Sequence, residues 1–182
     1  MYIFLLLTLA SSWFLKVSSS NYQALETLDL NKYIGKWYQV YEDNFDKTFQ
    51  KNGTCAIAYY DFLENGNVSV FNKELLNNKV DTIEGYAYYK DGNSGGYLSV
   101  KLEDNPEAPY WVIEVGPIIN NYYDYSIVSD NLKLSLFVLT RDVNRFYKLY
   151  NNQVLESIEN FGFTKSINKP IIMDQSDCAQ IE

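Results

Sequence analysis

Few residues in this chain could do covalent or metal chemistry. The sequence contains no histidine and only two cysteines, Cys55 and Cys178. Without histidine the chain cannot form a Ser-His-Asp or Cys-His nucleophilic site, a histidine zinc site or a histidine-ligated haem. Two cysteines are too few for a zinc ribbon or a ferredoxin-type cluster. A carboxylate pair could still act as acid and base, but no motif marks one, so we expect no enzyme activity, no cofactor and no metal site.

The charge of the chain argues against another class of partner. There are 15 Lys and Arg against 23 Asp and Glu, which gives a net charge of −8. Nucleic-acid-binding proteins present a basic stripe to the phosphate backbone, and this sequence has none. An acidic surface also disfavours tight docking on anionic membranes. We therefore expect no nucleic-acid partner.

The N-terminal segment differs in composition from the rest of the chain. Residues 3–15 read IFLLLTLASSWFL, and small residues follow up to Ser20. An apolar run of this length before small residues is typical of a secretory signal peptide, and it is too short for a stable membrane-spanning helix. We expect residues 1–20 to be a signal peptide and residues 21–182 to form one secreted domain. An uncleaved N-terminal membrane anchor is the alternative.

Secretion changes how the cysteines and two asparagines are interpreted. In an oxidising compartment an even pair is most simply one disulfide, here Cys55–Cys178, with two free buried thiols as the alternative. Closing so long a loop stabilises a fold by about 4–5 kcal/mol on the loop-entropy model. The sequons at Asn52 and Asn67 are candidate N-glycosylation sites.

Short segments with strand character fill the middle of the chain. Aromatic and β-branched residues favour strands, and turn signals such as Asn65-Gly66 separate them. No helices alternate with these segments, which argues against a parallel α/β sheet. The eight predicted strands are Lys36–Glu42, Cys55–Phe62, Val68–Leu75, Thr82–Lys90, Tyr97–Leu102, Tyr110–Val115, Tyr123–Ser129 and Lys133–Thr140.

One amphipathic helix follows the strands. Apolar residues recur every three or four positions from Val143 to Phe161, with Asp142 as the predicted N-cap and Gly162 as the stop. Eight antiparallel strands must protect their edges, either by closing into an up-and-down barrel or by forming a sandwich. The strand pattern by itself leaves both architectures open.

The order of these features resembles the lipocalin family. Gly35-Lys36-Trp37-Tyr38 is similar to the family's Gly-x-Trp motif, and Phe137–Arg141 is similar to its closing-strand arginine motif. The likeness runs from Leu28 to Cys178 and is greatest to the branch that contains apolipoprotein D and the bacterial and plant lipocalins. Further matching stretches are Asn65-Gly66, Val70–Leu75, Ile83–Ala87, Pro109–Trp111 and Asp174–Cys178.

The resemblance implies an all-β fold, an eight-stranded up-and-down antiparallel barrel with a C-terminal α-helix packed outside. It also implies that Gly35, Trp37 and Arg141 close one end of the barrel, with the guanidinium stacked on the indole. The family's third motif, Thr-Asp-Tyr, has no clear match in residues 115–125. No receptor contact at that turn is therefore carried over.

Alternation along the strands predicts which residues line the inside of such a barrel. If Trp37 points inward, every second residue of its strand shares that face. The resemblance favours Tyr60 and Asn72 as lining residues. A one-residue shift of register would invert the set on any strand. The predicted cavity residues are Gln39, Tyr41, Ala58, Tyr60, Asn72, Ile83, Ala87, Leu98, Val100, Trp111 and Phe137.

The predicted wall is mainly apolar and aromatic with a few polar groups. That chemistry suits a fatty acid, sterol, retinoid or pigment, so we expect a secreted carrier of one small hydrophobic ligand. One alternative is a lipid-protective or protein-interaction module that dimerises weakly or touches lipid surfaces transiently. Another is a lipocalin-type enzyme, which would need a free cysteine or pocket carboxylates. In the plainest alternative the side chains simply fill the barrel.

Overall fold

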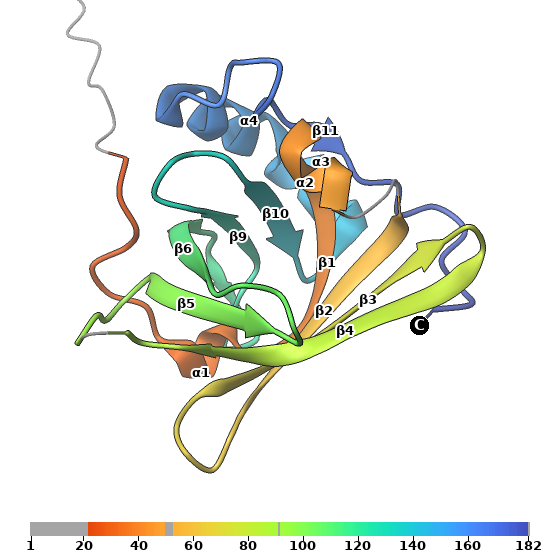
Figure 1. Cartoon of the computed structure of the whole chain (residues 1–182). Helices are drawn as coiled ribbons and strands as arrows, with labels where there is room; N and C mark the ends of the chain where they lie inside the picture. The colour runs from red at the N-terminus through yellow and green to blue at the C-terminus, as the bar shows by residue number, and fades with distance from the viewer. Residues whose placement is uncertain (1–21, 50–52, 91, 182) are drawn as a thin grey trace, which may run out of the picture.

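Eight strands form a closed antiparallel barrel (Figure 1). The structure is a computed structural model that describes residues 22–49, 53–90 and 92–181. Consecutive barrel strands pair with one another, and a pairing between the last and the first closes the sheet, which confirms the barrel and excludes the sandwich. The barrel strands are β1 (Gly35–Glu42), β2 (Thr54–Phe62), β3 (Val68–Leu76), β4 (Lys79–Tyr88), β5 (Tyr97–Leu102), β6 (Ala108–Val115), β9 (Tyr125–Ser129) and β10 (Leu136–Thr140).

Three shorter strands lie beside the barrel. A small hairpin of β7 (Ile118–Ile119) and β8 (Tyr122–Tyr123) occupies the connection between β6 and β9. Near the C-terminus, β11 (Ile171–Ile172) pairs with the end of β1. The first strand therefore holds β2 on one side and both β10 and β11 on the other.

Several strand boundaries differ from the prediction by one to three residues, and two of the differences have identifiable reasons. β10 begins at Leu136 and not at Lys133, because the Asp130 carboxylate accepts the backbone N–H groups of Leu134 (3.0 Å) and Ser135 (2.7 Å). β4 begins at Lys79, because Asn77 and Asn78 make a two-residue turn in which both φ angles are positive, 53° and 62°. Asparagine tolerates that conformation, as type I′ hairpins require.

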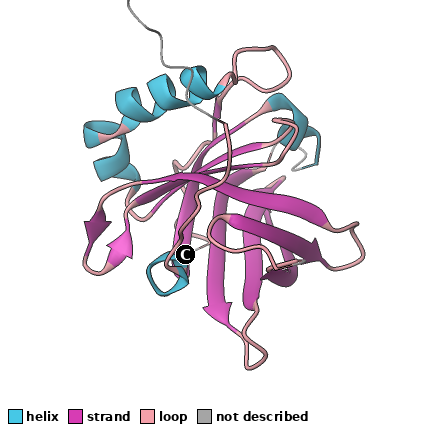
Figure 2. Cartoon of the chain, turned by 90° about the vertical axis from the view of Figure 1, so that its left-hand side faces the viewer, coloured by secondary structure: helices cyan, strands magenta, loops and turns pink. Residues whose placement is uncertain are grey.

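The helices lie outside the strands (Figure 2). The predicted amphipathic stretch forms α3 (Val143–Leu149) and α4 (Asn151–Phe161), and its apolar stripe packs on the outer face of the barrel. The Asp142 side chain accepts the Arg145 N–H, and Gly162 ends the helix with a φ of 94°, so both predicted boundaries are confirmed. Two short helices, α1 (Leu30–Tyr33) and α2 (Asn44–Phe49), lie at opposite ends of β1.

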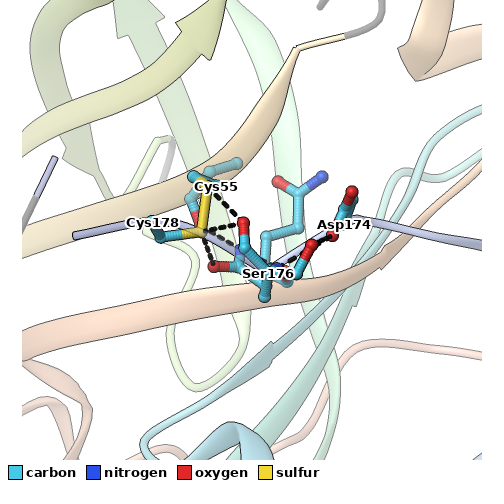
Figure 3. Close-up of a disulfide and its surroundings, with 7 residues drawn as sticks. Cys55, Asp174, Ser176 and Cys178 are labelled. Carbon is cyan, nitrogen blue, oxygen red and sulfur yellow. Dashed lines mark hydrogen bonds between the residues drawn. A yellow bond between two sulfur atoms is a disulfide. The ribbon is translucent and has the colours of Figure 1, made fainter. Parts of the chain in front are cut away.

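A disulfide ties the C-terminal tail to the barrel (Figure 3). Cys55 in β2 is bonded to Cys178, and their Cα atoms are 5.5 Å apart, so neither thiol is free. Beside the disulfide, the Cys55 N–H donates to the Asp174 carbonyl (2.7 Å) and the Gln175 side chain donates to the carbonyls of Gln39 and Ala56. The tail is thus held by covalent and hydrogen bonds together.

Some sequence predictions fall on parts of the chain that are not described. Residues 1–20, the predicted signal peptide, and Asn52, the first sequon, lie outside the described residues. Asn67, the second sequon, lies in the turn between β2 and β3 and is partly exposed. Among the described residues, no helix is both long and apolar enough to cross a membrane.

Candidate functional site

Two buried clusters distinguish the inside of the barrel from its outside. The inner cluster surrounds Trp37 and contains Tyr60, Val70 and Leu98. The outer cluster joins β1, β9 and β10 to α3 and α4. Residues opposite each other on neighbouring strands share a face of the sheet. A residue paired with one from the inner cluster therefore points into the barrel, and a residue paired with one from the outer cluster points away from it.

Most of the predicted cavity residues come together on the inner face. Ala58, Tyr60, Ala87 and Leu98 belong to the inner cluster, and Val100 and Phe137 pack against it. The remaining three are placed by register, since Gln39 is opposite Leu139, Asn72 is opposite Ala58, and Ile83 is opposite Asn72.

Tyr41 and Trp111 lie on the outer face instead. A bulge between Gln39 and Tyr41 shifts the register of β1, so the Tyr41 ring packs on Phe146 and its hydroxyl donates to the Asn151 side chain (2.7 Å). Trp111 packs edge-on against Tyr97, with ring centroids 5.1 Å apart, and also contacts Tyr22. The expectation that either side chain faces the interior is therefore corrected.

Two tyrosines that the sequence analysis did not select reach the interior. Tyr110, the neighbour of Trp111, packs against the inner cluster, and Tyr33 enters it from α1. Their hydroxyls lie 2.9 Å apart. The alternation on β6 would have predicted Tyr110 if the inward-facing set had been shifted by one residue. No pattern in the sequence predicts that Tyr33 reaches the interior.

Trp37 and Arg141 close one end of the barrel. Trp37 is fully buried, and the Arg141 guanidinium carbon lies 3.5 Å from its ring centroid. Arg141 also donates to the backbone carbonyls of Lys36 (2.6 Å), Ile34 (2.8 Å) and Tyr33 (3.0 Å). Burial lowers the pKa of Arg141 to about 10. The N–H groups of Arg141 thus connect α1 and the start of β1 to the end of β10 through hydrogen bonds.

The atypical turn after β6 has a polar anchor that the sequence analysis left unassigned. Asp124 is buried, and its carboxylate accepts two bonds from Arg145 in α3, from Nε (2.7 Å) and from Nη2 (2.5 Å). Its backbone N–H donates to the Pro117 carbonyl (2.9 Å). A bidentate pair of this kind fixes direction as well as distance. Asp124 therefore connects the closed end of the barrel to the helix.

The interior is filled near this closed end and accessible toward the other. A void of about 20 Å³, room for about one water molecule, lies among apolar residues and tyrosines. Farther along the strands, Asn72, Val100 and Phe137 keep part of their surface accessible although they are on the inner face. The void is lined by Leu30, Tyr33, Tyr60, Val68, Val70, Ala87, Leu98 and Tyr110.

A larger hollow lies on the outside of the barrel. It encloses about 580 Å³ over β3, β4 and β5, and Phe71, Tyr86 and Lys101 line it together with Glu84 and Glu103. These side chains alternate with the inward-facing ones and so point away from the interior, and Val70 borders both the hollow and the inner void. It is open to solvent and mixes both charges with apolar surface, which does not resemble an enclosed apolar site.

Two buried carboxyls lie at the end of the barrel opposite Trp37. Asp43 accepts the N–H of Asp46 (2.9 Å), and Asp46 accepts the N–H of Leu136 at the start of β10 (2.8 Å). Burial and the neighbouring negative charge raise the pKa of Asp46, and burial raises the pKa of Asp43. The first bond is local to the start of α2, and the second holds α2 against β10. Within the described part of the chain, no three histidine, cysteine or acidic side chains are grouped so as to hold a metal ion.

Comparison with known families gives a match over most of the chain. The sequence model of a family described as "Lipocalin-like domain" matches residues 28–170. Apolipoprotein D from Bos taurus is 40% identical over 105 residues, which are 57% of this chain and 51% of the bovine protein. The match thus spans about half the length of that relative. Apolipoprotein D from Macaca fascicularis is 33% identical over 165 residues, 85% of this chain and 81% of its own.

A solved structure gives the same architecture. The crystal structure of the major allergen Per a 4 from cockroaches aligns with a TM-score of 0.63 and covers 88% of this chain and 97% of the allergen. The two sequences are 18% identical. At that identity the likeness concerns the barrel and its helices alone.

Proposed function

Since the chain belongs to the lipocalin family, we propose that it binds and carries a small hydrophobic molecule, such as a fatty acid, sterol, retinoid or pigment, inside its barrel. One observation carries the proposal. Apolar side chains on the inner face, among them Val100 and Phe137, keep accessible surface in a barrel whose other end is closed by Trp37 and Arg141. Covering such a wall contributes roughly 25 cal/mol per Å² of apolar surface.

The proposed lining is the inward set that remains once Tyr41 and Trp111 are removed. Ligands of this class occupy sites of roughly 300 Å³ or more, so a ligand that reaches the closed end must displace side chains around the small void. The Oδ1 atom of Asn72 is buried, and no donor from the described residues reaches it. A ligand hydroxyl could donate to it. The lining comprises Gln39, Ala58, Tyr60, Asn72, Ile83, Ala87, Leu98, Val100 and Phe137, to which we add Tyr110.

The proposal includes secretion and excludes catalysis. The apolar segment before Ser20 is the support for a signal peptide, and the Cys55–Cys178 disulfide fits an oxidising compartment. Asn67, partly exposed in a hairpin turn, is the proposed glycosylation site, together with Asn52. Members of this family generally bind and transport. The bonded state of both cysteines supports the same view, because it leaves no thiol nucleophile.

A cavity-filling variant with a matched control tests the proposed function. Val100→Trp places a large ring on the inner face, whereas Val80→Trp makes the same change on an exposed position of β4. We expect V100W to weaken binding of the fluorescent probe N-phenyl-naphthylamine about ten-fold or more and V80W to leave it unchanged. Fluorescence titration measures both. Wild-type protein that binds no apolar probe, and that yields no extractable lipid by mass spectrometry, would refute the proposal.

A further inference from the structure

A continuous chain of hydroxyl groups lies at the closed end of the cavity. The Tyr60 hydroxyl is 3.2 Å from that of Tyr110, which is 2.9 Å from that of Tyr33, which in turn is 3.1 Å from the Ser126 hydroxyl. The four residues come from β2, β6, α1 and β9, so they are far apart in sequence. Tyr33, Tyr60 and Ser126 are almost fully buried.

A count of hydrogen atoms shows that the row of four hydroxyl groups can form a hydrogen bond with one more group. Each hydroxyl supplies one donor and accepts up to two bonds, so four hydroxyls bring four hydrogens to three links. One hydrogen and several lone pairs are left over. Donor and acceptor can exchange roles in each of the three hydrogen bonds, so the Tyr60 hydroxyl can present either a donor or an acceptor to a further group. That hydroxyl belongs to a residue that lines the void together with Tyr110.

The basic side chain at this closed end, Arg141, is engaged by the protein itself. The hydrogen bonds resolved for its guanidinium all go to backbone carbonyls, those of Tyr123, Lys36, Lys32, Tyr33 and Ile34. Burial has the larger effect on the pKa values of Tyr33 and Tyr60 and raises them, although the charge of Arg141 lowers both. A carboxylate brought to this place would therefore lose its hydration without gaining an ion pair.

The pKa values of the buried tyrosine hydroxyls show that this environment disfavours a negative charge. Burial raises the pKa of Tyr60 to about 12 and also raises the pKa values of Tyr33 and Tyr110. Farther along β3, Glu74 shares the inner face with Asn72, since two residues separate equivalent positions on a strand. An anionic ligand would have to pass this carboxylate on its way inward.

We propose that the barrel selects neutral ligands that carry a hydroxyl or carbonyl oxygen at their buried end, and that this oxygen joins the hydroxyl chain of Tyr60, Tyr110, Tyr33 and Ser126. The inference rests on the proposed function and narrows its ligand class to alcohols and ketones over carboxylates. The apolar body of the ligand then lies along the inner wall toward Val100 and Phe137.

A pair of ligands with the same hydrocarbon chain tests this preference directly. Dodecanol and dodecanoate are titrated against the wild-type protein loaded with N-phenyl-naphthylamine, at about pH 8, where the carboxylate is ionised. We expect dodecanol to displace the probe at a concentration about ten-fold lower than dodecanoate, the difference that one net hydrogen bond makes. Equal displacement, or tighter binding of dodecanoate, overturns the inference.

Two conservative variants and a control locate the preference. Tyr110→Phe removes the central oxygen of the hydroxyl chain and should weaken dodecanol binding about three- to ten-fold while leaving the affinity for dodecanoate as it is. Tyr60→Phe removes only the end of the chain and serves if Tyr110→Phe proves unstable. Tyr86→Phe, on the outer face, should change neither affinity. A dodecanol preference that survives both interior variants assigns recognition elsewhere and overturns the inference.

The outcomes separate this inference from the proposed function. If the probe binds and is displaced equally by both ligands, the protein is a carrier of apolar molecules without the selectivity argued here. If the probe and both ligands fail to bind to wild-type protein, both the proposed function and this inference are refuted. Retention of the fluorescence of bound probe in Tyr110→Phe shows that the variant still folds.

Discussion

Arg141 has a structural role that a lysine cannot reproduce. The guanidinium stacks on Trp37 and donates to carbonyls from α1, the start of β1 and β8. A planar fork of five N–H groups suits this geometry, and an ammonium does not. Arg141 is thus a structural residue, and because its donors are used by backbone carbonyls, we expect it to add little affinity for anionic ligands.

Arg141→Lys should therefore destabilise the protein although it keeps the charge. We expect a loss of about 2–4 kcal/mol in the free energy of unfolding, because several hydrogen bonds to a buried charged group disappear with the stack. Urea denaturation followed by tryptophan fluorescence measures it. Lys148→Arg, on an exposed position of α3, is the matched control. A loss below about 1 kcal/mol, as for an exposed charge, would contradict the role.

The buried pair Asp43 and Asp46 predicts a particular dependence on pH. An acid whose pKa is raised by folding holds its proton more tightly in the folded state, so its contribution to stability is greatest below about pH 4 and is lost as the pH rises. Asp46→Asn keeps an acceptor for the Leu136 N–H without the charge. We expect the stability of D46N relative to wild type to increase between about pH 5 and pH 8.

Chemical denaturation at the two pH values measures this difference. Asp81→Asn removes a carboxylate that is exposed on β4, and should leave the pH dependence of wild type as it is. A constant offset between D46N and wild type at both pH values would mean that Asp46 is ionised throughout.

At the scale of elements, alternation placed the inward residues correctly on β2, β3, β4, β5 and β10 and failed on β6 and at the end of β1. Trp37 supplied the reference for β1, and the family resemblance supplied Tyr60 on β2 and Asn72 on β3, which the strand pairing places on the same face. On β6 no such reference exists in the sequence, so Trp111 was assigned to the inner face in place of Tyr110. The prediction for Tyr41 is wrong for a different reason. A bulge between Gln39 and Tyr41 adds a residue to β1, so the strict alternation of inward and outward residues is interrupted there.

The disulfide is the element-scale feature with the clearest energetic consequence. Replacing Cys55 and Cys178 together by alanine removes a cross-link that closes a separation of 123 residues. We expect the variant to lose about 4–5 kcal/mol on the loop-entropy model and β11 to exchange its amide hydrogens faster. Equilibrium unfolding and hydrogen exchange measure these effects. Wild-type protein under reducing conditions is the control, and unchanged stability in both would contradict the prediction.

For the whole molecule, the strand pattern together with the resemblance to the lipocalin family predicted the closed fold better than the space inside it. Strand number and order follow from alternation and turn residues spread over the entire chain, so single errors do not alter the architecture. The free volume depends instead on a few side-chain positions. Tyr33 reaches the interior from α1, which precedes all barrel strands, and its contacts with Tyr110 and Ser126 join residues more than 70 positions apart. No local pattern contains that information.

Closure of the barrel also has a consequence for biosynthesis. Tyr38 in β1 is opposite Thr140 in β10, which is 102 residues later. At a ribosomal rate of 5–20 residues per second, the first strand waits roughly 5–20 s for its partner. During that time one edge of β1 is an unpaired template, open to association with other nascent chains. The order of the strands along the chain therefore leaves an early strand unpaired until a late one is synthesised.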